Sequence, residues 1–396
     1  MQNFLKRSWA EIDLDAVKSN YEYIKKKAGS RNIFAVVKAD AYGHGAEMLV
    51  NIYEQLGCNG YAVSNVQEAL NIRKIVKEKP ILILGYTPKE CCLTLCENNI
   101  SQAVFSENYA NELKSVLEKE NKRLSVHIKV DTGMCRLGFN CRNENQIEDC
   151  AKAISTALKD ECFIKDGIFT HYSVADSKNN IDVDFTRAQS ERFSQIVKKL
   201  PFKFKYIHSC NSAGTFSLDS NVGNTVRPGI VLYGLLPDRA LSNNSLIPVL
   251  SLKSTIGMVK EIEKGCEISY GRTFKAENKI TLATVPIGYA DGYARKLSNC
   301  GRVIVNGKYA NIVGRVCMDQ LMIDVTDIEN VTSGSIVTLI GTDGGLTITA
   351  DEIAEKTDTI SYEVLCGISQ RIPRIYIKDG NVTDAKKYIL SEETND

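Results

Sequence analysis

The sequence lacks the features that mark membrane, secreted and nucleic-acid-binding proteins. Its 396 residues hold no apolar stretch long enough to span a bilayer. The first thirty residues carry Glu11, Asp13 and Asp15 in place of the continuous apolar core of a signal peptide. The formal net charge is only +1, with lysine and arginine scattered along the chain, so nothing attracts nucleic acid or an anionic membrane. These absences predict a cytoplasmic protein with neither a nucleic-acid nor a membrane partner.

Metal-binding and disulfide patterns are missing as well. The chain has only four histidines (His44, His127, His171 and His208) and no clustered ligand motif, so we expect no metal site. Its 13 cysteines form no Cys-x-x-Cys pair and no regular framework, which favours reduced thiols in a chain of this length. With 43% hydrophobic and 24% charged residues, the composition is that of an ordinary globular protein of two domains.

The first 240 residues alternate short apolar runs with segments of helical periodicity. Eight strands alternating with helices over about 200 residues predict the α/β class and a (β/α)8 TIM-type barrel. An open doubly wound sheet is the alternative. The expected strands are 33–37, 60–64, 81–84, 102–105, 125–130, 167–171, 206–208 and 229–233, and the expected helices are 14–28, 66–77, 107–120, 145–158 and 185–200.

Beyond Leu246 the apolar runs become rich in Val, Ile and Thr. Asn306-Gly307, between two of these runs, is a strong hairpin signal. We therefore expect a barrel domain at 10–243 and a mostly β C-terminal domain at 244–396, which also takes residues 1–9. The alternating segment 8–13 could belong to either domain. The remaining expected elements are strands at 250–259, 280–286, 303–305, 310–313, 321–325 and 335–340, and a helix near 349–356.

Lys38 ends the apolar run 33–37 and precedes a polar, glycine-containing turn at 39–45. A lysine at the carboxyl end of a buried strand can be desolvated, so part of it is neutral and nucleophilic at pH 7. That is what a Schiff-base lysine needs. Taken alone, a lysine that leaves the sheet for solvent is the simpler interpretation.

Further candidates stand at the expected ends of later strands, where barrels gather their catalytic groups and often bind phosphate. Neutral side-chain and backbone donors of this kind can bind a phosphate. Each candidate has an ordinary structural explanation, but together they predict a cofactor pocket. They are Lys129 and Arg136 after the fifth strand, His171 after the sixth, Asn211 and Ser212 after the seventh, and Arg227, Gly229 and Ile230 opening the eighth.

Longer motifs extend this pattern from Trp9 to Tyr376, over nearly the whole chain. They are Val37-Lys38-Ala39-Asp40-Ala41-Tyr42-Gly43-His44-Gly45, Lys129-x-Asp131-Thr132-Gly133-Met134-x-Arg136, Arg227-Pro228-Gly229-Ile230, Ser269-Tyr270-Gly271-Arg272, Pro286-Ile287-Gly288-Tyr289-Ala290-Asp291-Gly292-Tyr293, Gly314-Arg315-Val316-Cys317-Met318-Asp319-Gln320, Tyr362-Glu363-Val364-Leu365 and Arg371-Ile372-Pro373-Arg374. Several long motifs in order are far more specific than one short pattern. They resemble the motifs of alanine racemases, fold type III enzymes that use pyridoxal 5′-phosphate.

The resemblance implies two catalytic bases. Lys38 would bond to the cofactor and then serve one face of the substrate α-carbon. Tyr270 would serve the opposite face from the second subunit of a homodimer with shared active sites. An ordinary tyrosine has a pKa near 10, so His171 and Arg227 are expected to couple to its phenol. Without the surrounding motif, Tyr270 would be interpreted as a packed tyrosine of the β domain.

The family also places Arg227 against the pyridine nitrogen of the cofactor, where many related enzymes use a carboxylate. A guanidinium does not take up a proton. The ring nitrogen is therefore expected to stay unprotonated, which makes the cofactor a weaker electron sink and limits leakage into transamination or decarboxylation.

Other roles follow from the same resemblance. The positions that match phosphate ligands are Tyr42, Ser212, Gly229, Ile230 and Tyr362, and those beside the cofactor are Asn211 and His171. The substrate pocket is matched by Arg136, Met318 and Asp319, and its entrance by Tyr289 and Arg295. Lys129 matches a position that is carbamylated in some members and fixes Arg136.

The resemblance thus implies an enzyme that interconverts L- and D-alanine and supplies D-alanine for peptidoglycan. Tyr362 matches alanine-specific members, whereas serine racemases of vancomycin resistance carry asparagine there, so serine is expected to be a slower substrate. Two alternatives stay open. One is a pyridoxal-phosphate amino-acid decarboxylase, which also combines a barrel with a β domain. The other is a cofactor-carrying barrel protein without turnover, which needs neither the β domain nor an equivalent of Tyr270.

Overall fold

The computed structural model describes residues 6–217, 222–237 and 245–388, which form two compact units. The barrel unit consists of Lys18–Ala41 and Ala46–Ile247, and the β unit of Met1–Val17, Tyr42–Gly45 and Pro248–Asp396. The boundary expected between 243 and 244 lies outside the described residues.

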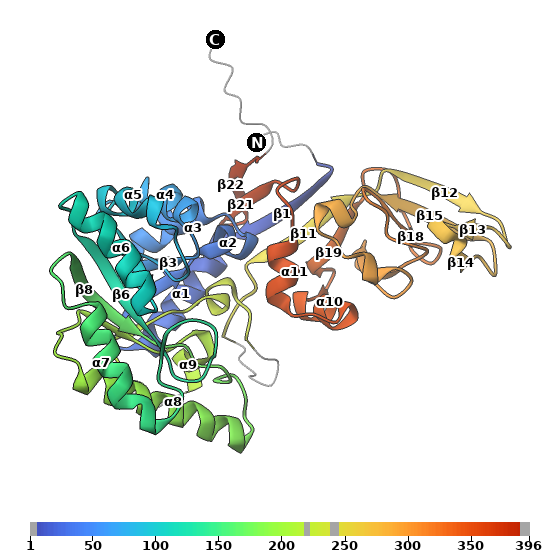
Figure 1. Cartoon of the computed structure of the whole chain (residues 1–396). Helices are drawn as coiled ribbons and strands as arrows, with labels where there is room; N and C mark the ends of the chain where they lie inside the picture. The colour runs from blue at the N-terminus through green and yellow to red at the C-terminus, as the bar shows by residue number, and fades with distance from the viewer. Residues whose placement is uncertain (1–5, 218–221, 238–244, 389–396) are drawn as a thin grey trace, which may run out of the picture. The chain divides into compact units, whose positions relative to one another are not determined.

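Eight parallel strands close into a barrel (Figure 1). The order β5-β4-β3-β2-β10-β9-β8-β6 closes because β5 pairs with β6, with Gln102 opposite Val126, and the short β7 (Phe139–Asn140) pairs with the end of β6. The predicted (β/α)8 barrel is confirmed and the open sheet is wrong. The barrel strands are β2 (Asn32–Val36), β3 (Gly60–Val63), β4 (Ile81–Ile83), β5 (Ile100–Val104), β6 (Leu124–Asp131), β8 (Phe163–Phe169), β9 (Tyr206–His208) and β10 (Thr225–Val226).

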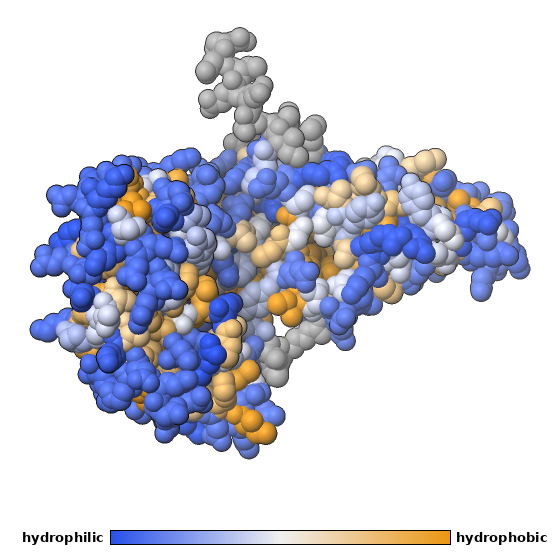
Figure 2. All heavy atoms as spheres, viewed as in Figure 1, coloured by the Kyte–Doolittle hydropathy of each residue, from blue (hydrophilic) through white to orange (hydrophobic). Residues whose placement is uncertain are grey.

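The barrel strands read as continuous apolar runs because both of their faces are covered. Every residue of β3, β4 and β5 is buried. In the face drawn in Figure 2, hydrophilic residues dominate the helices around the barrel. The helices that alternate with the strands are α1 (Leu14–Ala28), α3 (Ala46–Gln55), α4 (Val66–Arg73), α5 (Cys92–Glu97), α6 (Glu107–Lys119), α7 (Ile147–Ala157), α8 (Asn180–Lys199) and α9 (Ser212–Ser217).

The eighth strand differs from the prediction. Residues 229–233 were expected to be extended, but they hold a buried 3₁₀ helix, η3 (Ile230–Tyr233), and the strand β10 lies before it. Periodicity cannot separate a short strand from a buried helical turn, and Pro228 has no N–H for a strand ladder. Arg227 therefore follows a strand end, as Lys38 and His171 do, instead of opening a strand.

The β unit is built on a mixed sheet in the order β12-β15-β18-β17-β16-β19-β11-β1-β21-β22, with β20 on β19. Asn306 and Gly307, with φ of 48° and 70°, join β16 to β17, which confirms the predicted hairpin. Its elements are β1 (Ser8–Asp13), β11 (Leu250–Thr255), β12 (Met258–Ile262), β13 (Glu267–Ile268), β14 (Phe274–Lys275), β15 (Ile280–Val285), β16 (Arg302–Val305), β17 (Lys308–Ile312), β18 (Leu321–Asp324), β19 (Ile336–Asp343), β20 (Leu346–Ile348), α10 (Ala350–Thr357), α11 (Ser361–Gly367), β21 (Arg374–Lys378) and β22 (Asn381–Lys386).

Strand β1 belongs to this sheet, because it pairs antiparallel with β11 and parallel with β21. The run predicted at 250–259 is two strands, β11 and β12, separated at Ile256-Gly257. The predicted helix is α10, which is capped by Thr349 through a hydrogen bond from Glu352 N. Among the residues that the structure describes, no helix combines the length and the apolar character needed to cross a membrane.

Candidate active site

Lys38 follows β2 and begins α2 (Lys38–Gly43), which is a left-handed turn. The four residues after Lys38 have φ between 50° and 56°, and Gly43 has φ of 83°. This conformation costs an L-residue about 1–2 kcal/mol, so neighbouring contacts must hold it. Ala39 N donates to Glu68 Oε1 at 2.9 Å, and Ala46 N donates to Asp40 Oδ1 at 2.7 Å. Backbone strain of this kind is typical of functional sites.

Arg227 is a buried cation, 3% exposed, at the end of β10. Its Nη1 donates to His208 Nδ1 at 2.8 Å, and its Nη2 donates to Thr170 O at 2.8 Å and contacts His171 Nδ1 at 3.4 Å. Burial lowers the pKa of Arg227 to about 10, so the guanidinium stays charged at neutral pH. Its Nε–H and the second hydrogen of Nη1 have no hydrogen-bond partner among the described residues, which leaves donors for a ligand acceptor.

Four basic side chains lie near His171. Burial lowers the pKa of His171 well below its ordinary value, and Arg227, Lys129, Arg136 and Lys38 lower it further. The imidazole is therefore neutral at pH 7. The fold brings basic residues from three separate motifs to one place, and this concentration of positive charge suits a ligand that carries a phosphate or a carboxylate.

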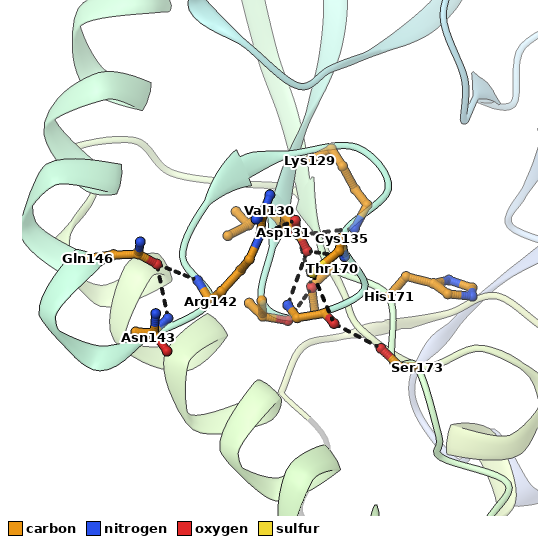
Figure 3. A network of polar contacts seen from close by, with 12 residues as sticks. Lys129, Val130, Asp131, Cys135, Arg142, Asn143, Gln146, Thr170, His171 and Ser173 are labelled. Atoms are coloured by element: carbon orange, nitrogen blue, oxygen red, sulfur yellow. Dashed lines mark hydrogen bonds and ion pairs between the residues drawn. The ribbon is translucent and has the colours of Figure 1, made fainter.

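The loop after β6 carries Arg136 and is organised by Asp131 (Figure 3). Asp131 accepts hydrogen bonds from Gly133 N at 3.1 Å, Cys135 N at 3.0 Å and Arg142 Nε at 2.8 Å. Burial raises the pKa of Asp131, but these donors outweigh it and hold the pKa below its ordinary value. A Cβ at Gly138, where φ is 135°, would lie 2.4 Å from Asp131 N, so only glycine allows this turn to close.

Lys129 is 5% exposed and also belongs to this network (Figure 3). Its Nζ donates to Val130 O at 3.0 Å and lies 5.2 Å from the centre of the Phe169 ring. Burial lowers the pKa of Lys129 to about 7, with Arg227 adding to the effect and Asp131 opposing it. A large fraction of the amine is therefore neutral and nucleophilic at pH 7.

Ser212 and Gly229 join two loops at the ends of β9 and β10. Gly229 N donates to Ser212 Oγ at 2.9 Å, which leaves the serine hydroxyl hydrogen to donate to a ligand. Ile230 begins η3 directly after Gly229. The Asn211 side chain instead caps α9, where its Oδ1 accepts from Gly214 N at 3.0 Å.

In the β unit, the Tyr42 and Tyr362 rings lie 6.0 Å apart. Burial, together with Tyr362, raises the pKa of Tyr42, so its phenol stays protonated. The buried Arg374 holds the end of α2, since its Nε donates to Gly43 O at 2.8 Å and its other nitrogens donate to carbonyls of residues 368–372.

Tyr270 begins a short 3₁₀ turn, η4 (Tyr270–Arg272), and is 72% exposed. It is therefore not a packed tyrosine of its own unit. Ser269, Gly271 and Arg272 all have positive φ (68°, 70° and 50°), and Ser269 Oγ donates to Arg315 O at 2.7 Å. A strained turn thus presents the phenol on the surface of the unit.

The expected pocket and entrance residues Met318 and Tyr289 lie on joined loops. Tyr289 N donates to Cys317 O at 3.1 Å, and Ala290 N donates to Met318 O at 3.0 Å. A Cβ at Gly288 would lie 2.3 Å from Cys317 O, so the two backbones approach too closely for another residue.

Asp291 joins separate segments of the β unit through ion pairs with Arg7 and Arg371. Its carboxylate, completely buried, accepts from both Nη atoms of Arg7 at 3.1 Å and 2.9 Å. Arg371 lies 3.6 Å from Asp291 and donates to Asp319 at 2.8 Å, which orients the Asp319 carboxylate. Arg295, the other expected entrance residue, is exposed and begins η6 (Arg295–Leu297).

The structure thus gathers the expected residues into two groups, one in each unit. Sequence reasoning missed the polar residues that hold them, above all His208, Thr170, Arg374 and Asp291. His208 and Thr170 are polar residues inside or beside apolar strands, and Arg374 and Asp291 stand in the motifs quoted above, but their partners Gly43 and Arg7 lie far away in the sequence.

Comparison with known proteins gives one answer for both units. Residues 12–237 match the family model of the alanine racemase N-terminal domain, and residues 249–376 match that of the C-terminal domain. The alanine racemase of Clostridium novyi (strain NT) is 43% identical over 392 residues, which cover 98% of this chain and 100% of that relative.

Solved structures agree. Alanine racemase of Clostridium difficile 630 has a TM-score of 0.91 at 35% identity, covering 98% of this chain and 100% of that one. Alanine racemase of Bartonella henselae with covalently bound pyridoxal phosphate has a TM-score of 0.83 at 29% identity, covering 94% and 99%. The chain therefore belongs to the alanine racemase family.

Proposed function

We propose that this chain interconverts L- and D-alanine with pyridoxal 5′-phosphate as its cofactor. Relatives that carry this activity in their names align over nearly the whole chain. The observation that carries the proposal is the arrangement of Arg227. It is a buried guanidinium with both Nη atoms bonded and its Nε–H left over, beside His171, whose pKa Lys38 also lowers.

The described residues fit this cofactor. The Ser212 hydroxyl and the N–H group of Ile230 would hold its phosphate, the N–H of Gly229 would turn to it from Ser212 Oγ, and Arg227 Nε–H would donate to its ring nitrogen. Tyr42 and Tyr362 are proposed as further phosphate ligands, and Asn211 as the residue that positions α9. When bound through Lys38, the cofactor supplies an electron-withdrawing ring that acidifies the hydrogen on the substrate α-carbon.

Lys38 and Tyr270 are the proposed bases. Lys38 Nζ takes or returns the α-proton on one face, and Tyr270 Oη does so on the other.

Tyr270 would act from a second copy of the chain in a homodimer with shared active sites. Its 72% exposed phenol, together with the exposed Met318 (52%) and Tyr289 (42%) of the same unit, supports a surface that another copy covers.

The neutral His171 and the charged Arg227 set the reaction type. Neither residue is a carboxylic acid that could give a proton to the ring nitrogen of the cofactor. That nitrogen would therefore stay unprotonated, which would favour simple proton exchange over decarboxylation or transamination. This argues for the racemase over the decarboxylase alternative.

For the substrate, Arg136 would bind the carboxylate beside Met318 and Asp319, with Tyr289 and Arg295 at the entrance. A carbamate on Lys129 would bring a negative charge to Arg136, and the low pKa of Lys129, about 7, supports its formation. Tyr362 supports alanine over serine.

We place the activity in a bacterial cytoplasm, where D-alanine serves peptidoglycan synthesis. The 13 cysteines are all free thiols, which suits a reducing compartment.

The decisive test is a D-amino-acid oxidase-coupled assay with L-alanine and L-serine side by side on the purified protein. We expect D-alanine as the main product, slower formation of D-serine and no release of carbon dioxide. Carbon dioxide with an amine product would identify a decarboxylase. A protein that binds the cofactor without any product would be a carrier.

A further inference from the structure

Three buried side chains form a hydrogen-bonded chain inside the barrel. Arg227 Nη1 donates to His208 Nδ1 at 2.8 Å, and His208 Nε2 lies 2.8 Å from His127 Nδ1. Both histidines are 0% exposed. The three residues come from β6, β9 and the end of β10, so a polar chain runs through an interior that apolar side chains normally fill.

Arg227 sets the direction of every hydrogen in this chain. A guanidinium has only donors, so His208 Nδ1 must be an unprotonated acceptor. A neutral His208 then carries its hydrogen on Nε2 and donates it to His127 Nδ1, and His127 carries its own hydrogen on Nε2. Burial lowers the pKa of both histidines, with Arg227 adding to the effect, and the pKa of His127 falls to about 3. Both rings are therefore neutral at physiological pH.

The packing holds both rings in place. His208 stacks on Phe169 at 4.9 Å with an interplanar angle of 2°, and His127 stacks on Tyr206 at 5.8 Å with an angle of 13°. Gly167 lies opposite His127 in the register of β6 and β8, and a Cβ there would lie 2.3 Å from His127 Nδ1. The barrel therefore reserves space for this imidazole.

Stability alone does not account for His127. Its Nε2 is buried and has no hydrogen-bond partner among the described residues. An unpaired buried donor costs free energy that an apolar residue of similar size would avoid. The useful atom of His127 is Nδ1, the acceptor that faces His208.

We propose that His127 is a positioning residue for Arg227. By accepting the hydrogen of His208 Nε2, it fixes the His208 ring in the orientation that turns Nδ1 towards Arg227, and so fixes the direction in which the guanidinium presents Nε–H. Without this acceptor, His208 Nε2–H is a buried donor without a partner, so the ring is free to turn and its hydrogen bond from Arg227 weakens. The inference rests on the proposed function, in which Arg227 faces the cofactor ring.

A matched pair of variants isolates the hydrogen bond. In His127→Asn, the amide oxygen can take the place of Nδ1 and accept from His208. His127→Leu has the same number and branching of side-chain heavy atoms as the asparagine variant but no acceptor. Both variants lose the stacked ring, so the difference between them reports the acceptor alone.

The first measurement needs neither cofactor nor turnover. In ¹⁵N spectra of the unloaded protein, which has four histidines, His208 should carry its hydrogen on Nε2 and show coupling through the hydrogen bond to His127 Nδ1. His127→Asn should keep the hydrogen-bonded chemical shift of His208 Nε2–H, and His127→Leu should lose it. A wild-type His208 with its hydrogen on Nδ1 overturns the proposal, whether or not the variants fold.

The second measurement uses the loaded enzyme. We expect the absorption maximum of the bound cofactor to shift in His127→Leu and to stay in place in His127→Asn. The ratio of transamination to racemisation should rise about tenfold in the leucine variant, the effect of one lost charge-assisted hydrogen bond, and about twofold or less in the asparagine variant.

Two results would overturn the proposal: wild-type spectra and product ratio in His127→Leu, or equal losses in both variants, which would assign the effect to ring packing. A wild-type protein without racemisation would instead overturn the proposed function, while the ¹⁵N measurement would still decide the tautomer.

Discussion

The two units present their candidate groups in opposite ways. In the barrel, Arg227 and Lys129 are buried and His171 is half-buried, all among fixed partners, and burial shifts the pKa of each. In the β unit, Tyr270 and Met318 are 72% and 52% exposed. The contrast suggests a division of labour: one chain sets the electronic environment of the cofactor, while the second proton donor depends on assembly.

The largest effect should come from separating the two proposed bases. Lys38→Ala and Tyr270→Phe should each lower racemisation by about 10⁴-fold or more, because each removes a group that transfers a proton. After the two inactive variants are unfolded together and refolded as a mixture, about a quarter of the wild-type activity should return, since half the dimers are mixed and each holds one intact site. The coupled assay measures this directly.

The control for this mixing is each variant refolded alone, which should stay inactive. If the refolded mixture contains dimers, as measured by size, but recovers no racemase activity, both bases act within the same subunit. The proposed difference between the barrel unit and the β unit would then be wrong.

A smaller effect is expected when the charge in the barrel is reversed. Arg227→Glu puts a carboxylate among Lys38, Lys129 and His171, and it can share a proton with the ring nitrogen. Racemisation should fall by about 10²–10³-fold, the usual cost of removing one electrostatic partner, while the transamination ratio rises. Arg227→Gln, which removes the charge without adding a carboxylate, is the matched control and should lose rate without the same gain in transamination.

The sequence predicts best those features that depend on local patterns. Strand β1 was predicted at its observed bounds because residues 8–13 alternate, and the Asn306-Gly307 hairpin because its turn needs positive φ. The eighth strand was misplaced because an apolar run from 229 to 233 packs equally well as a helical turn.

The site was predictable only in part. Motifs point to Lys38 and Arg227, and an expected strand end points to His171. Nothing local predicts that α2 is left-handed or that Arg374 donates to Gly43 O. His127 and His208 lie in separate strands, and their contact depends on how β6 and β9 pair with β8 between them, which no spacing reveals.

Acid should destabilise the barrel unit through its neutral histidines. Because the folded pKa of His127 is about 3 and an unfolded histidine titrates near 6.5, the unfolded chain binds more protons between these values. The stabilisation is complete above pH 6.5 and is lost as the pH falls, by up to about 1.4 kcal/mol per pH unit for each such histidine.

Urea denaturation between pH 7 and pH 4 measures this loss. In His127→Asn the pH slope should decrease by about one proton. An unchanged slope would show that His127 is not neutral in the folded protein.

The smallest effect concerns Lys129, a buried barrel residue with a lowered pKa that is proposed to act on substrate binding. A carbamate forms from the neutral amine, and the neutral fraction rises as the pH passes through about 7. The KM for alanine should therefore fall with increasing pH and with added bicarbonate, and Lys129→Ala should raise KM about fivefold, roughly one hydrogen bond to a charged group, with kcat nearly unchanged. Bicarbonate should have no effect on this variant. If bicarbonate alters the KM of Lys129→Ala as it alters that of the wild type, the low pKa of Lys129 is a consequence of burial without a role in substrate binding. Burial in the barrel would then affect the cofactor but not the substrate.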